Sequence, residues 1–219
     1  LKTSRASTAW PRRRTRRRLK AMAEDFDQLK AQIRACRVCQ PHLDHPVRPV
    51  VRGEASAVIR IIGQAPGTRV QLSGMPFTDP SGDRLRDWMG VSEAEFYDER
   101  AIAITPMGFC FPGLDAKGGD KPPRRECPPL WQDRASTALP HVKLTLLVGA
   151  HAQRWHLGEA AAKTLTETVK QWRLHLPDYV ALPHPSWRNT GWLKRNPWFE
   201  NEVLPELKAR VRKMLNSLN

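Results

Sequence analysis

His184 stands in the rigid frame Pro183-His184-Pro185-Ser186, directly after an apolar run. A histidine between two prolines has little backbone freedom, and its ring can donate a hydrogen bond to an oxygen on which negative charge develops. Ser186 is placed to bind a nearby phosphate. A lone histidine is more often structural, but this frame at the end of a predicted strand favours catalysis.

A glycine-rich turn, Gly63-Gln64-Ala65-Pro66-Gly67, follows another apolar run. Such a turn directs several backbone N–H groups at one point, where they can bind a carbonyl oxygen or a water beside a substrate. The alternative is an ordinary strand-to-helix turn, which is the commoner origin of an isolated glycine-rich loop.

Aromatic side chains accompany both loops. Phe77, before a helix predicted to be capped near Ser81 and Asp83, is either a stacking platform over a pocket or a core residue. The segment from Trp187 to Trp192 includes Arg188 and Asn189 and is suited to fill the gap left by a flipped base and to bind the strand. Alternatively, its two tryptophans only pack under the loop.

The four cysteines form a CxxC pair, Cys36 and Cys39, and a second pair, Cys110 and Cys127. In an intracellular chain this pattern favours a four-thiolate site for zinc or for an iron–sulfur cluster over disulfides. Ligand number does not separate the two, since both accept four cysteines.

Short apolar runs alternate with amphipathic stretches, which predicts a three-layer α/β/α sandwich around a four-stranded parallel sheet. In such a sheet, ligands bind at the carboxyl ends of the strands, where His184 and the Gly63–Gly67 turn follow. The predicted strands span 58–62, 101–105, 144–148 and 179–182, and the predicted helices include 83–89, 129–139, 150–157, 165–173, one ending near Cys36 and one carrying Val203 to Leu215.

The 219 residues carry a net charge of +14, and the first 22 contribute nine positive charges and no acid. We expect residues 1–22 to be a disordered basic tail that contacts phosphates, or alternatively a targeting peptide, and residues 23–219 to form one domain. No apolar run approaches the roughly 20 residues that span a bilayer. The sequence therefore favours a soluble cytoplasmic, nucleoid-associated monomer without a membrane partner.

Over roughly Leu29 to Leu215 the chain resembles the uracil-DNA glycosylase superfamily, especially its iron–sulfur-bearing fourth family. The similar segments are GQAPG, MPF followed by SGDRL, LLVGAHA, HPSWRN and the cysteine spacing, in the family's order. The resemblance implies excision of a flipped base from DNA, with His184 stabilising the departing base and Phe77 stacking on it. It also implies a 4Fe-4S cluster on the cysteines, with zinc as the alternative.

Three positions depart from the family's pattern. Gln64 and Ala65 replace the acid that positions water, and neither accepts a proton as a carboxylate does. Thr105 leads into Pro106 where an asparagine usually reads the base edge, and Trp187 with Arg188 replaces a smaller wedge.

These features predict a DNA glycosylase for uracil or another deaminated base. One alternative is a metal-stabilised nucleic-acid-binding protein of the same fold with little or no turnover, and another is a pocket for a free base or nucleotide. Candidate catalytic residues are His184 and Gln64; candidate substrate contacts are Gly63, Ala65, Pro66, Gly67, Phe77 and Thr105; candidate DNA contacts are Ser186, Trp187, Arg188 and Asn189.

Overall fold

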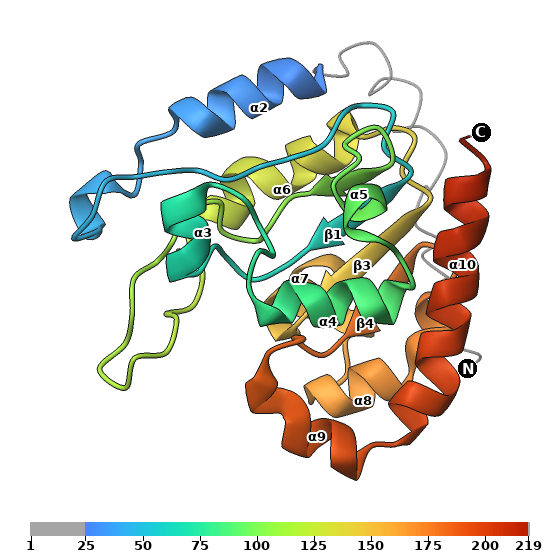
Figure 1. Cartoon of the computed structure of the whole chain (residues 1–219). Helices are drawn as coiled ribbons and strands as arrows, with labels where there is room; N and C mark the ends of the chain where they lie inside the picture. Colours follow the sequence, from blue (N-terminus) through green and yellow to red (C-terminus); the bar gives the residue numbers. More distant parts are fainter. Residues whose placement is uncertain (1–24, 219) are drawn as a thin grey trace, which may run out of the picture.

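A four-stranded, wholly parallel sheet with helices on both faces forms the centre of the protein (Figure 1). The computed structural model describes residues 25–218. The strands are β1 (Ile59–Ile62), β2 (Ile102–Ile104), β3 (Leu144–Val148) and β4 (Tyr179–Leu182), in the spatial order β2-β1-β3-β4. The predicted α/β/α fold class is confirmed.

The helices divide between the two faces of the sheet (Figure 1). One face packs against α4 (Pro80–Met89), α8 (Leu165–Lys170) and α10 (Leu204–Asn216), and the other against α2 (Phe26–Ala35), α6 (Cys127–Ala138) and α7 (Ala150–Leu157). Shorter elements are η2 (Gln40–His42), α3 (Thr68–Ser73), α5 (Glu93–Phe96), η3 (Gly158–Ala160), η4 (Trp172–His175), η5 (Trp187–Asn189), α9 (Thr190–Arg195) and the π-turn η6 (Phe199–Val203).

Successive side chains of β1 point to opposite faces of the sheet and pack against different helices. Ile59 and Ile61 belong to the core beneath α4 and α10, while Ile62 contributes to the core beneath α7. Arg60 points to the α6 face, where it bonds to Gln132 and Ser136 of that helix. The layer between the sheet and α6 thus buries one guanidinium among polar side chains that accept its hydrogen bonds.

Three helices differ in their bounds from the prediction, and one of them, α6, spans Cys127–Ala138 instead of 129–139. Helix α4 begins at Pro80, and its cap is Asp79, whose side chain accepts from the Gly82 N–H at 3.3 Å, rather than Ser81 or Asp83. Proline suits the first turn of a helix because its missing N–H would be unbonded there. The helix expected over 165–173 ends as α8 at Lys170 and continues as the 3-10 turn η4.

The basic tail predicted for residues 1–22 lies outside the described residues. Within residues 25–218, no helix is both long enough and apolar enough to cross a bilayer.

Candidate active site

A cavity of about 510 Å³ opens at the carboxyl ends of β1 and β4. The Gly63–Gly67 turn forms one wall, and the loop after β4 forms another. The remaining lining includes Pro76, Phe77, Asp79, Ile104, Pro106, Asp120, His184, Trp187 and Arg188. Segments far apart in the sequence therefore meet where ligands bind in parallel α/β sheets.

His184 enters this cavity from the proline-framed loop. Its Nδ1 accepts a hydrogen bond from the Ser186 N–H at 3.2 Å, and its carbonyl accepts from the Asn189 side-chain amide at 2.7 Å. Burial lowers the pKa of His184 below its ordinary value, while Asp79 acts in the opposite direction. Because Nδ1 is an acceptor, the neutral ring carries its proton on Nε2, which makes Nε2–H a donor.

The Gly63–Gly67 turn is held by the segment after β2. The Met107 N–H donates to the Gly63 carbonyl and the Gly108 N–H to the Gln64 carbonyl, each at 2.9 Å. The Gln64 side-chain amide donates to the Lys121 carbonyl at 3.3 Å. The turn lines the cavity, as expected of its five residues, but Gln64 is tied to a neighbouring loop by its own side chain.

Phe77 lies at the edge of the core and at the wall of the cavity, so its position is consistent with both interpretations of the sequence. Its ring packs edge-on against Phe96 at 5.8 Å between centroids, and it also lines the cavity. Its φ of 58° is unusual for a non-glycine residue, and its carbonyl accepts from Tyr97 and Arg86. A Cβ at Gly63 would lie 3.3 Å from the Phe77 ring, so glycine there allows the ring to approach the turn.

Two carboxylates line the same cavity, and the sequence assigned a role to neither. Asp79 caps α4, whereas Asp120 comes from the long loop before α6 and lies beside Gly67. Burial raises the pKa of the Asp120 carboxyl above its ordinary value, against the opposing charge of Arg188. A carboxyl of this kind can accept a proton from water. Asp120 thus places a carboxyl group in the cavity beside the Gly63–Gly67 turn, which has none of its own.

Thr105 does not contact this cavity, contrary to the expectation that it binds substrate. It is 0% exposed, and its hydroxyl accepts from the Arg60 Nε at 2.7 Å. Gln132 also bonds Arg60, at 2.8 Å, and its amide donates to the Pro106 carbonyl at 2.8 Å. Thr105 therefore lies behind the wall, and its neighbours Ile104 and Pro106 face the cavity.

The candidate DNA contacts Ser186 to Asn189 lie at and in η5, which follows the loop after β4. Trp187 is 73% exposed, with the Arg188 guanidinium 5.8 Å from its ring centroid, so packing under the loop is wrong for Trp187. It is right for Trp192, whose indole N–H donates to Thr166 and whose ring contacts Phe199. The Ser186 hydroxyl accepts from the Arg188 N–H at 3.2 Å, which caps η5.

All four cysteines line one narrow cavity between α2 and α6. They are free thiols, and the Phe109 N–H points at the Cys127 sulfur at 3.4 Å. Burial in apolar surroundings raises the pKa of Cys110 and of Cys127 to about 12. The described residues, 25–218, include no group of three or more His, Cys, Asp or Glu side chains arranged as ligands of a metal ion.

Fold and cavity together define a parallel α/β protein whose pocket, at the carboxyl ends of the strands, is lined by a phenylalanine, a glycine-rich turn and a buried histidine. The family model described as the Uracil DNA glycosylase superfamily matches residues 51–208. Because this match covers well over half of the chain, the protein belongs to that superfamily. Membership supports a glycosylase-type hydrolase that acts on DNA.

Proposed function

We propose that the protein hydrolyses the N-glycosidic bond of uracil or another deaminated base that has been flipped out of DNA into the 510 Å³ cavity. The observation that carries the proposal is the neutral His184, whose Nε2–H is free to donate inside a cavity that Phe77 also lines. Family membership supplies the reaction class, and the cavity supplies the residues.

When the bond between the sugar and the base breaks, the bonding electron pair leaves with the base, and negative charge develops on a base carbonyl oxygen. His184 donates its Nε2–H to that oxygen. A fixed neutral donor of this kind contributes roughly 10²- to 10³-fold in kcat when it serves developing charge. Stacking on Phe77 orients the ring, and the Gly63–Gly67 turn approaches its edge.

Water completes the reaction by bonding to the sugar carbon that the base has left. We assign the proton it loses to Asp120, since this carboxyl lines the cavity and has a raised pKa. Gln64 then orients the water molecule and does not deprotonate it, because an amide is not a base at neutral pH. Asp79 is less suited, since its Oδ1 already accepts from Ser81 at 2.6 Å and from Gly82.

Incubation with labelled duplexes carrying uracil, hypoxanthine or xanthine, followed by alkali, tests the proposal. Cleavage by the wild type that is lost in His184→Ala and retained in His141→Ala, an exposed-histidine control, supports it. Binding of abasic duplex without cleavage of any substrate favours instead the turnover-free binding protein, which the apolar wall at Pro106 allows. Binding of free bases but of neither duplex favours the nucleotide pocket.

We also propose that the four cysteines bind a 4Fe-4S cluster. Its support is the number and type of the side chains, since all four cysteines line one narrow cavity. The four thiols are not grouped at metal-binding distances in the described residues, so the proposal includes their closing around the cluster. When bound, the cluster would be structural, joining the segment after α2 to both ends of the 110–127 loop. Absorbance at roughly 400 nm in the purified protein supports iron, because iron–thiolate clusters are coloured. A colourless protein containing stoichiometric zinc supports the alternative.

A further inference from the structure

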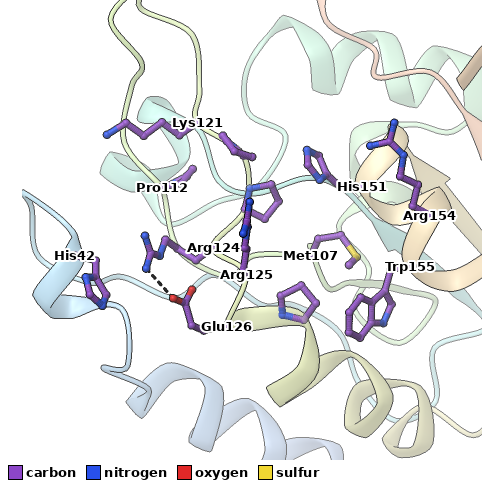
Figure 2. A pocket seen from close by; sticks show the side chains of 13 residues that line it. His42, Met107, Pro112, Lys121, Arg124, Arg125, Glu126, His151, Arg154 and Trp155 are labelled. Carbon is purple, nitrogen blue, oxygen red and sulfur yellow. Dashed lines mark hydrogen bonds and ion pairs between the residues drawn. The ribbon is translucent and has the colours of Figure 1, made fainter. Parts of the chain in front are cut away.

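A second cavity, of about 770 Å³, is lined by residues that neighbour those of the candidate active site in the chain. Figure 2 shows the side chains that line it. Most of its side chains come from the loop before α6 and from α7, and His42 of η2 and Met107 complete the lining. Figure 2 shows Arg124 of the loop turned toward Glu126, Arg125 near the middle of the lining, and Arg154 on the side formed by α7. Lys121 and His151 add further nitrogen groups to the lining.

The positive charge of this cavity is largely uncompensated. Arg124 pairs with Glu126 at 2.8 Å, and its Nε is buried without a hydrogen-bond partner. In residues 25–218, no carboxylate lies within ion-pair distance of Lys121, Arg125 or Arg154. Clustered cations without acidic partners favour an anionic ligand, and arginine suits phosphate in particular.

An aromatic surface accompanies the cations. Trp155 lines the cavity and is 39% exposed, although tryptophan in a monomeric core is mostly buried. Met107 and several prolines add apolar surface around it. A stacking ring beside several arginines fits a nucleotide, with the base on the ring and the phosphate on the guanidinium groups.

The two cavities share a wall. Asp120 lines the candidate active site, while the next residue, Lys121, lines the basic cavity. Gln64 belongs to the first cavity and donates its side-chain amide to the Lys121 carbonyl. Met107 lines the second cavity, and its N–H donates to Gly63 of the first. A strand that places one nucleotide in the first cavity therefore carries its neighbours past the second.

We propose that the basic cavity binds a neighbouring nucleotide of the same DNA strand, stacking its base on Trp155 and contacting its phosphate through Arg124, Arg125 and Arg154. The proposal rests on the proposed function, which brings the strand to the first cavity. The protein would then bind at least two unstacked nucleotides of one strand, one in each cavity. We therefore expect it to bind single-stranded DNA.

The test uses full-length protein in the His184→Ala background, so that binding is measured without turnover. Single-stranded oligonucleotides carry uracil with fluorescent 2-aminopurine at successive flanking positions. We expect 2-aminopurine at one flanking position to be quenched on binding. Trp155→Ala should abolish this quenching and weaken affinity roughly ten-fold, while Trp155→Phe should restore most of both.

The cations are tested by salt dependence. For the Arg125→Gln, Arg154→Gln double variant, the slope of log affinity against log salt should fall by about 0.7 for each phosphate that the protein no longer neutralises. The matched controls are Lys213→Gln on α10 and Leu174→Ala, an exposed apolar residue, both outside the lining of either cavity. Both controls should bind as their parent does.

Unchanged quenching and affinity in Trp155→Ala, or an unchanged salt slope in the arginine variant, would overturn the proposal. So would stronger competition by an acidic peptide than by an undamaged oligonucleotide, since that outcome identifies a protein partner. Failure of the proposed function is distinguishable, because it appears as wild-type protein that cleaves no duplex. Trp155-dependent quenching can still occur in that case.

Discussion

Replacing His184 with alanine removes one donor from the candidate active site, and its effect follows from the hydrogen bonds of the ring. The Nε2–H is the only ring donor of the neutral side chain, because Nδ1 accepts from Ser186. We expect kcat to fall roughly 10²- to 10³-fold, about 3 to 4 kcal/mol in the barrier, with KM nearly unchanged. The Ser186 N–H also loses an acceptor, which costs about 1 kcal/mol of stability.

The pH dependence separates this mechanism from general acid catalysis. Since the pKa of His184 is lowered by burial, the ring is neutral at and above its ordinary value of 6.5. Protonation at Nδ1 would break the bond from Ser186. The histidine contribution to kcat should therefore be constant near neutral pH and fall as the pH drops through the lowered pKa.

The free energy of unfolding should also decrease as the pH falls. In the window between the lowered folded pKa and 6.5, the unfolded chain binds more protons, so the free energy of unfolding decreases as the pH falls. Single-turnover excision and urea unfolding between pH 5 and 8 (a range of roughly three units around the histidine value) measure both effects. A His184-dependent rate that rises ten-fold for each unit of acidification would refute the neutral-donor mechanism.

Three further predictions concern the surroundings of this histidine. Asp120→Asn should lower kcat roughly 10²-fold and remove an acidic limb of the pH–rate profile, with Asp115→Asn as control; an unchanged limb contradicts the role in water activation. Gly63→Ala should weaken substrate binding more than it weakens folding, because its Cβ would lie 3.3 Å from the Phe77 ring; equal KM values contradict this. Arg60→Met should lower the free energy of unfolding by about 2 to 4 kcal/mol, because it removes three hydrogen bonds and only partly compensates by removing a buried charge. Urea titrations measure this change, and an unchanged free energy of unfolding contradicts the prediction.

The sheet and its carboxyl edge were predictable because buried parallel strands are apolar runs bounded by glycine and proline. Thr105, which we expected to contact substrate, is buried away from the cavity, and the alternation of side chains along the strand explains why. Side chains alternate along β2, so Ala103 and Thr105 face α6, whereas Ile104 faces the other layer and lines the cavity at its end. Applying the two-residue period to 101–105 would have excluded Thr105.

The acid and the basic cavity were not predictable in this way. Asp120 lies in an irregular loop that a local bridge between Leu114 and Asp120 shapes, and its carboxylate lies beside Gly67, which is distant in the sequence. Likewise, α6, β3 and the first turn of α7 separate Arg125 from Arg154, and neither residue lies within a motif. Periodicity describes regular elements, while the walls of a pocket come from loops that only the fold brings together.

The loop between Cys110 and Cys127 contributes residues to the cysteine cavity, to the candidate active site and to the basic cavity. Its two ends line the cysteine cavity, its middle places Asp120 in the candidate active site, and Lys121 with Arg124 and Arg125 lines the basic cavity. A cluster bound to all four cysteines would fix both ends of this loop. If the proposed cluster is present, Cys110→Ser should therefore weaken strand binding and excision together, even though the cysteine contacts neither substrate nor DNA. Loss of colour with both activities intact would show that the fold alone positions the loop.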